Sequence, residues 1–259
     1  MKTLALRAIF FSNSKKIISL LLVLLFLTAC AHRAPFPVES PKPEAVWQDI
    51  LLQGNTQARA FEVSFSLVSS APETKKYRLA GQLWGNTKGP VRLDLRASIG
   101  TLVAIIAERN DNWLFYNALQ QTACKGPMRS LSRELTIALP FSLKTLGAVM
   151  LGSIKELLPP IYQKATVARD GTVLYHFKKE TGIQTLKVSA DGLPMELETD
   201  TWQMSWPGWK TGEVPPRLHF KDTRASILLF TKKHTFYNSE HPDSEIEFQL
   251  PPDIQVLHR

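Results

Sequence analysis

Every second residue is apolar in three successive segments of this chain, and this alternation is the strongest constraint on its fold. The segments are residues 61–67, 77–83 and 91–97. Because successive side chains of a β-strand point to opposite faces, each segment predicts a strand with one apolar and one polar face. Turn-forming residues such as Pro72 and Gly89 separate the segments. The pattern therefore favours consecutive antiparallel strands with one face on the core and one in water.

Further strands are expected along most of the remaining chain. Residues 102–107 form a continuous apolar run, which predicts a more deeply buried strand, and residues 113–116 follow a turn. The sequences Asp170-Gly171 and Asp191-Gly192 indicate hairpin turns. Alternation predicts further strands at residues 173–177, 183–188, 195–199, 218–220, 227–230 and 246–250.

Three segments have apolar residues at helical spacing. Residues 44–57 precede the first strand, residues 128–139 end at Pro140, and residues 143–150 end near Gly152. A sheet with this many strands curls. We therefore expect an α+β fold: a long curled antiparallel sheet, or half-barrel, with short helices covering an apolar cavity.

The first 30 residues resemble the signal peptide of a bacterial lipoprotein. Residues 1–16 hold four basic residues and no acidic one, and residues 17–27 form an apolar run. That run is shorter than the roughly 20 residues that span a bilayer. Leu-Thr-Ala precedes Cys30, as in a lipobox. We expect residues 1–29 to be removed and Cys30 to be lipidated, whereas the alternative is an ordinary signal peptide or short anchor that happens to end in cysteine.

The segment after the lipidation site is rich in proline. Residues 30–43 are expected to be the lipidated N-terminus and an extended tether, followed by a folded domain at residues 44–259. Removing the signal segment lowers the net charge from +8 to +4, because that segment has four basic residues and no acidic one. We see no basic stripe interleaved with aromatic residues, so nucleic acid is not an expected partner.

The sequence contains no recognisable catalytic or metal-binding motif, and we expect no enzyme activity, no cofactor and no metal. Glu196 and Glu198 lie on one face of a predicted strand and could form an acid–base pair, but a solvated sheet face is the favoured interpretation. Cys124 would be the one thiol left after lipidation. We expect it to be a small, partly buried side chain and not a reactive one.

Three further segments are informative together: residues 78–84, 92–100 and 139–152. They resemble the LolA/LolB family of half-barrel proteins, which handle the acyl chains of bacterial lipoproteins. The last is similar to the Pro-Leu-x-x-Leu segment of the family and to a following helix that ends in Leu-Gly. The likeness covers residues 44–205, whereas residues 202–216 have no counterpart in the family.

The resemblance implies a function in lipoprotein localisation. The chain would be a monomeric lipoprotein on the periplasmic face of the outer membrane, held there by its N-terminal acyl chains. It would accept acylated lipoprotein cargo from a periplasmic carrier and help to insert that cargo into the outer membrane. The apolar residues expected to line the lipid-binding cavity, for each of which ordinary core packing is the alternative, are Leu67, Leu79, Leu83, Leu93, Leu95, Ile105, Phe115, Leu131, Leu135, Leu146 and Met150.

Two alternatives stay open from the sequence. Ile99 matches a family position whose apolar side chain projects from a loop before a Pro-Leu-Gly turn and helps cargo enter the membrane, but here the proline is absent. Ile99 is therefore either a membrane-insertion side chain or the buried last residue of a strand. The chain as a whole could instead be a structural or assembly lipoprotein, which exposed side chains of Trp202, Trp206 and Trp209 would favour.

Overall fold

The computed structural model describes residues 41–53, 58–70, 76–97, 99–127 and 141–258. Residues Pro41–Arg259 form one compact unit. Cys30 and the tether preceding this unit lie outside the described residues, as do Leu131, Leu135 and the helix expected at residues 128–139.

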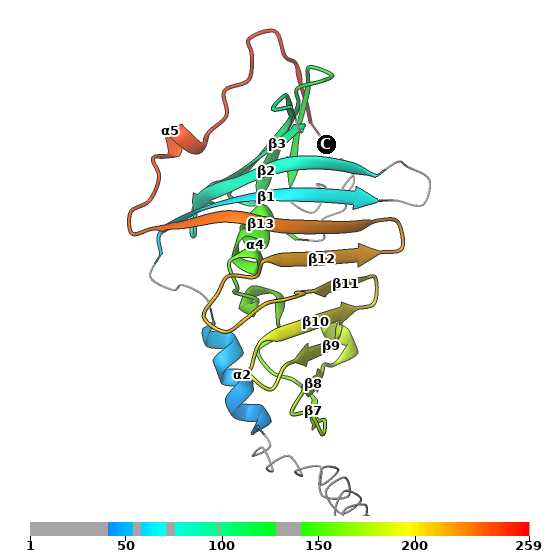
Figure 1. Ribbon diagram of the computed structural model, residues 1–259. Coiled ribbons are helices and arrows are strands. Elements are labelled where there is room, and N and C mark those ends of the chain that lie inside the picture. The colour runs from blue at the N-terminus through cyan, green and yellow to red at the C-terminus, as the bar shows by residue number, and fades with distance from the viewer. Residues whose placement is uncertain (1–40, 54–57, 71–75, 98, 128–140, 259) are drawn as a thin grey trace, which may run out of the picture. The chain divides into compact units, whose positions relative to one another are not determined.

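The described residues form one sheet of 14 strands (Figure 1). Its spatial order is β14-β6-β5-β4-β3-β2-β1-β13-β12-β11-β10-β9-β8-β7, and the sheet is not closed. All neighbouring strands are antiparallel except β14 and β6, which are parallel. The strands are β1 (Ala60–Ser70), β2 (Tyr77–Asn86), β3 (Val91–Ala97), β4 (Leu102–Arg109), β5 (Asn112–Asn117), β6 (Thr122–Pro127), β7 (Lys164–Val167), β8 (Val173–His176), β9 (Ile183–Val188), β10 (Pro194–Thr199), β11 (Trp202–Ser205), β12 (Arg217–Asp222), β13 (Ser226–Tyr237) and β14 (Val256–His258).

The sheet consists of two meanders that meet where β1 pairs with β13. Strands β1 to β6 follow one another in the first meander, and β7 to β13 follow one another in the second. All strands expected between residues 61 and 230 are confirmed. The hairpin turns at Gly171 and Gly192 are confirmed as well, and both glycines have positive φ values, +80° and +78°. Strands β6, β7, β11 and β14 were not predicted.

Helix α2 (Pro43–Leu52) packs against the second meander. It buries Val46, Trp47 and Ile50 at helical spacing. The Trp47 ring lies 5.1 Å from the ring of Tyr175 on β8, measured between centroids. The Tyr175 hydroxyl donates a hydrogen bond of 2.7 Å to the carbonyl oxygen of Pro43. This helix confirms the first of the three expected helices, although it ends at Leu52 and not at residue 57.

Helix α4 (Leu143–Met150) lies against β1, β2 and β3 of the first meander (Figure 1). It starts at Ser142, whose hydroxyl oxygen accepts a hydrogen bond of 3.0 Å from the Thr145 N–H, as expected of an N-cap residue. Leu143, Leu146 and Met150 are buried on the side facing the sheet. The helix has the bounds that the sequence predicted. The short helices are η1 (Lys155–Leu157), η2 (Lys179–Thr181) and α5 (Asp243–Ile246).

The two faces of the first meander both carry apolar clusters. The main core includes Ala104 and Ile106 of β4, together with the buried side of α4. Ile105 lies between them in sequence and therefore points to the opposite face. There it forms a second cluster with Tyr116 and Ala123, covered by side chains from the C-terminal segment: Phe248, Leu250, Ile254 and Val256.

The prediction of a strand at residues 246–250 is wrong. Ile246 ends helix α5, and residues 247–250 have no regular secondary structure. Ile246 is nonetheless buried, and Phe248 and Leu250 contact the second cluster. The alternation in this segment reflects side chains that cover the sheet face, because the segment packs on that face without joining the sheet.

Candidate functional site

Ile99 projects from one rim of the sheet. It lies in the turn between β3 and β4, and 88% of its side chain is exposed, so it is not the buried last residue of a strand. The turn is fixed by hydrogen bonds of 2.8 Å from the Gly100 N–H to the Ala97 carbonyl and from the Ala97 N–H to the Thr101 carbonyl. Gly100 has φ +88°, which glycine adopts without strain.

Leu119 is a second exposed apolar residue at the same rim. It lies in the turn between β5 and β6, and its side chain is 64% exposed. In an antiparallel meander alternate turns fall at the same end of the sheet, so the β3–β4 and β5–β6 turns share a rim. The Asn117 carboxamide oxygen accepts from the Leu119 N–H at 3.1 Å and so fixes the turn. Exposed Arg78 and Arg96, near the ends of β2 and β3, place positive charge at this rim.

Most residues expected to bind lipid lie together on one face of the first meander, where they form packed core. Within the described residues, Leu67, Leu83, Leu93, Leu95, Leu146 and Met150 are buried in the main core, and Leu79 and Phe115 pack against it. Ile105 is not brought together with them, since it belongs to the second cluster on the other face. None of these residues lines the pocket described next.

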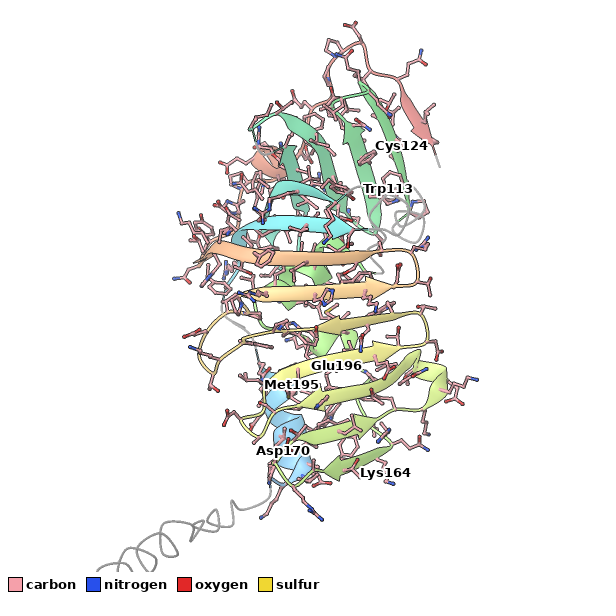
Figure 2. The ribbon with its side chains drawn as sticks, turned by 45° about the vertical axis from the view of Figure 1, so that its right-hand side comes forward. Trp113, Cys124, Lys164, Asp170, Met195 and Glu196 are labelled. Carbon is pink, nitrogen blue, oxygen red and sulfur yellow. The ribbon has the colours of Figure 1, made fainter. Side chains whose placement is uncertain are left out.

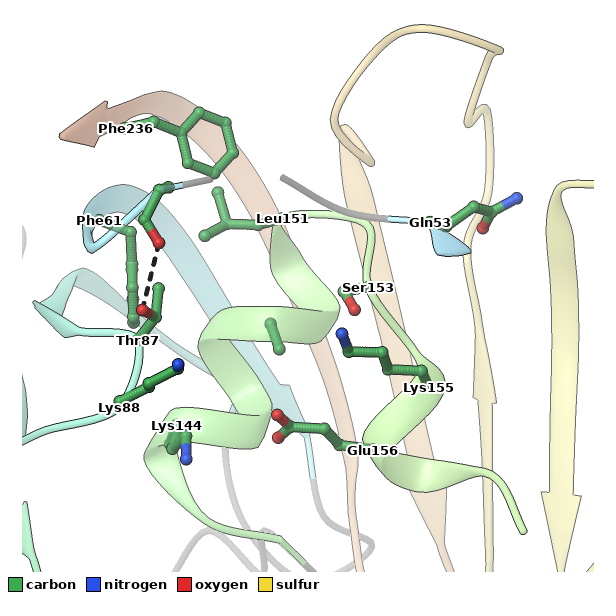
Figure 3. Close-up of a pocket in the computed structure, with 12 residues that line it drawn as sticks. Gln53, Phe61, Thr87, Lys88, Lys144, Leu151, Ser153, Lys155, Glu156 and Phe236 are labelled. Atoms are coloured by element: carbon green, nitrogen blue, oxygen red, sulfur yellow. Dashed lines mark hydrogen bonds between the residues drawn. The ribbon is translucent and has the colours of Figure 1, made fainter. Parts of the chain in front are cut away.

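A pocket of about 340 Å³ lies alongside α4, next to the main core (Figure 3). Its apolar lining comes from Phe61 of β1, Phe236 of β13 and Leu151 at the end of α4, with two alanines. Phe61 and Phe236 are opposite each other across the β1–β13 pair. This volume falls in the range of about 300–1,000 Å³ that small-molecule sites occupy. We call this site the α4 pocket; it was not predicted from the sequence because its lining comes from strands, turns and helices that are far apart in the chain.

The rim of the α4 pocket is polar and mostly positive. Lys88 follows β2, Lys144 lies on α4 and Lys155 on η1, whereas Glu156 is the single acidic residue of the lining. Thr87, also in the lining, donates its hydroxyl to the Ala58 carbonyl oxygen at 3.2 Å, which is the dashed line in Figure 3.

The paired glutamates of β10 are engaged in hydrogen bonds across the sheet. The side-chain amide of Gln203 on β11 donates to Glu196, which is labelled in Figure 2, and the Thr185 hydroxyl on β9 donates to Glu198 at 3.2 Å. These contacts support the interpretation that Glu196 and Glu198 are ordinary polar residues of a sheet face and not an acid–base pair. Cys124 is buried, as expected (Figure 2). Among the described residues, no three His, Cys, Asp or Glu side chains gather into a group that could hold a metal ion.

The three tryptophans of residues 202–209 pack inward. Trp206 is 3% exposed, and Trp202 and Trp209 pack against the main core. The Trp202 ring lies 5.7 Å from the ring of Phe220, between centroids. The three tryptophans therefore do not form an exposed aromatic patch. The alternative of a structural or assembly lipoprotein loses the observation that favoured it.

Comparisons with known proteins identify the fold. No family model matches the chain, and no curated protein matches it. A LolA superfamily protein from Nitrosomonas europaea has a similar solved structure, with a TM-score of 0.54, 13% identity, and coverage of 79% of this chain and 97% of that one. A structure from Vibrio parahaemolyticus described as an outer membrane lipoprotein-sorting protein domain gives a TM-score of 0.51 at 9% identity, over 77% and 94% of the two chains. A DUF1329 family protein from Desulfovibrio piger gives 0.54 at 10%, over 79% and 96%.

The chain therefore has the class of fold in which a large, unclosed, mostly antiparallel sheet is combined with a few short helices. More particularly, the fold is similar to that of the solved LolA superfamily protein, which is the kind of fold that the resemblance in sequence implied. At these identities the likeness defines the fold and leaves the activity to be argued from the site. No helix in the described part of the chain is both long and apolar enough to cross a membrane.

Proposed function

We propose that this chain is an envelope lipoprotein that binds the acyl chains of other lipoproteins and helps to insert them into the outer membrane. It acts as a binding protein and not as an enzyme. Cys30 carries its own lipid anchor, and the chain works as a monomer on the periplasmic face, receiving cargo from a periplasmic carrier. The observation that carries the proposal is the exposed Ile99 side chain on the rim of an unclosed, LolA-type sheet.

The energetics of acyl transfer explain why such a sheet suits the task. Each methylene that leaves a membrane costs about 0.8 kcal/mol, so a 16-carbon chain costs roughly 12 kcal/mol. A receptor needs an apolar interior that offsets this cost and a cover that keeps water out when no lipid is bound. The apolar face of the first meander supplies the interior, and α4 covers it with Leu143, Leu146 and Met150. The α4 pocket is where that interior reaches the surface.

Delivery requires contact with the bilayer. Ile99 and Leu119 are the large apolar side chains exposed at the rim formed by the β3–β4 and β5–β6 turns. Arg78 and Arg96 beside them complement the negative surface of a membrane that contains anionic lipids. The rim thus has the apolar and cationic groups that an interfacial contact uses.

A transfer assay tests this function. The chain without residues 1–29 and carrying Cys30→Ala is mixed with a carrier loaded with an acylated lipoprotein, and the cargo bound to each protein is measured after separation. We expect cargo to move from the carrier to this chain and then, on addition of liposomes, to the bilayer. The proposal fails if the chain takes no cargo under conditions in which an authentic receptor does.

A further inference from the structure

Three lysines from separate parts of the chain line the α4 pocket together with an apolar floor. Lys88 lies in the β2–β3 turn, Lys144 in α4 and Lys155 in η1. Figure 3 shows the ends of Lys88, Lys155 and Glu156 pointing toward the middle of the pocket, over α4. With one glutamate against three lysines, the lining has an excess of two positive charges.

Lys88 and Lys155 are available to an anionic ligand, whereas the charge of Lys144 also acts on the Glu108 carboxylate. None of the ion pairs found within the described residues includes Lys88, Lys144 or Lys155. The last carbonyl groups of α4 do not repel an anion strongly, since backbone N–H groups already bond to them. Leu151 N–H donates to the Gly147 carbonyl at 3.0 Å, and Ser153 N–H donates to the Ala148 carbonyl at 2.8 Å.

The apolar part of the pocket continues into the core. Phe61 is 2% exposed and belongs to the main core, whereas Leu151 and Phe236 pack against that core and border the opening. A ligand that fits both parts has a charged head at the lysines and an alkyl chain directed along Phe61.

We propose that the α4 pocket binds the head group of an anionic amphiphile, in which a phosphate or carboxylate is attached to an acyl chain. The diacylglycerol on a lipoprotein cysteine is uncharged and forms no ion pair with the three ammonium groups. A phospholipid or a fatty acid carries a negative charge that can pair with them. Ammonium groups bind such oxyanions as point charges. This inference rests on the proposed function, since it assumes that the adjoining interior accepts acyl chains, and it adds an acidic lipid to the ligands of that interior.

Calorimetric titration with four amphiphiles of equal chain length tests the inference. The probes are dodecyl phosphate, dodecanoate, dodecyltrimethylammonium and dodecyl maltoside, each kept below its micelle concentration. The protein is the chain without residues 1–29 and carrying Cys30→Ala. We expect the two anions to bind at least about tenfold more tightly than the cation, a difference of about 1.4 kcal/mol. Added salt should narrow that difference. A preference for dodecyl phosphate indicates a phospholipid source, and a preference for dodecanoate indicates a fatty acid.

Lysine variants then locate the site. In a Lys88→Gln, Lys155→Gln double variant, both anions should lose about tenfold in affinity while dodecyl maltoside is unchanged. Both lysines are exposed, so the thermal midpoint should stay that of the parent protein. The matched control, Lys125→Gln with Lys164→Gln, removes two exposed lysines from β6 and β7 and should leave all four affinities unchanged.

The outcomes separate the two proposals. If amphiphiles bind without regard to charge, or if the Lys88, Lys155 variant binds the anions as the parent does, the inference is overturned while the proposed function stands. If no amphiphile of any charge binds, both the inference about the anionic head group and the proposed acyl-binding function fail.

Discussion

The carboxylate of Glu108 on β4 accepts a hydrogen bond of 2.6 Å from the backbone N–H of Leu143, the first residue of α4. The next backbone N–H, that of Lys144, donates to the same oxygen at 3.4 Å. The first N–H groups of a helix have no partner within the helix, and a negative charge there also meets the positive end of the helix dipole. A side chain of the sheet thus fixes the start of the helix that covers it.

Replacing Glu108 by alanine should destabilise the protein. The variant leaves the Leu143 N–H without its acceptor in a partly buried position, which costs about 1–3 kcal/mol. Urea unfolding measures the change in the free energy of unfolding. Glu108→Gln is the matched control, since its carboxamide oxygen can still accept, and it should lose clearly less than the alanine variant. Equal losses in both variants would show that the hydrogen bond is not what matters.

Stability should also depend on pH through Glu108. Desolvation by burial raises the pKa of Glu108 above its usual value of 4.5, although the Leu143 and Lys144 N–H groups and the Lys144 charge act in the opposite direction. A carboxyl group with a higher pKa in the folded state binds more protons there, so stability falls as pH rises from the unfolded pKa through the folded one. Glutamine cannot titrate. The free energy of unfolding of the parent minus that of Glu108→Gln should therefore decline across this window and be constant above it, and a difference independent of pH would contradict the assignment.

The membrane-contact hypothesis predicts a selective effect at Ile99. Because this side chain is 88% exposed, Ile99→Glu should change the free energy of unfolding by no more than about 0.5 kcal/mol. Cargo uptake from the carrier should be retained, and delivery to liposomes should be slowed severalfold, because a carboxylate resists entry into the bilayer interface. Delivery is followed by flotation of the cargo with the vesicles.

Ile161 provides the matched control for that experiment. It is 77% exposed and precedes β7 at the far edge of the second meander. Ile161→Glu adds the same charge at another exposed isoleucine and should leave delivery at the parental rate. If both variants slow delivery alike, net charge and not the rim is responsible.

The sheet was largely predictable from the sequence, and the reason is burial on one face. Strands such as β1 alternate strictly because Phe61, Val63 and Phe65 enter the core while the residues between them are partly exposed. Short β7 and β14 have no such signal, since β7 lies at the edge of the sheet and most of its residues are exposed. Alternation at residues 246–250 led to the wrong prediction of a strand. An alternating pattern indicates which side chains are buried, and it does not show that the backbone forms hydrogen bonds with a neighbouring strand.

The candidate site was only partly predictable. The turn position of Ile99 was recognisable from resemblance, but its exposure is decided by how β3 and β4 end. The continuous apolar run of β4 could not reveal that Ile105 would serve a second cluster, because that cluster needs side chains from residues 248–256. The α4 pocket combines Lys88, Lys144 and Lys155, and no local pattern relates them.

Burial of the Ile246 side chain, at the end of α5, should contribute to stability. Ile246 is 1% exposed, so Ile246→Ala should lower the free energy of unfolding by about 2–5 kcal/mol. Leu257→Ala, at a side chain that is 51% exposed in β14, serves as the control and should cost much less. Urea unfolding of both variants gives the two losses, and a larger loss for Leu257→Ala would show that the Ile246 side chain is not an important part of the packed interior.

A last prediction concerns the close contact between β1 and β2 inside the main core. Gly81 is directly opposite Phe65, and a Cβ atom added at Gly81 would lie 2.2 Å from the Phe65 ring. Glycine within a strand usually costs about 0.5–1 kcal/mol relative to alanine, so backbone entropy alone would make Gly81→Ala stabilising. Overpacking costs about 1–3 kcal/mol, and Phe65 is 3% exposed, so its ring has little room to move. We therefore expect Gly81→Ala to be destabilising.

A double variant tests the cause of that loss. The smaller side chain of Phe65→Leu should relieve the clash, so the double variant should lose less stability than the sum of the two single losses, by about 0.5–3 kcal/mol. Urea unfolding of the four proteins gives this coupling, and additive losses would mean that the ring does not close over the glycine.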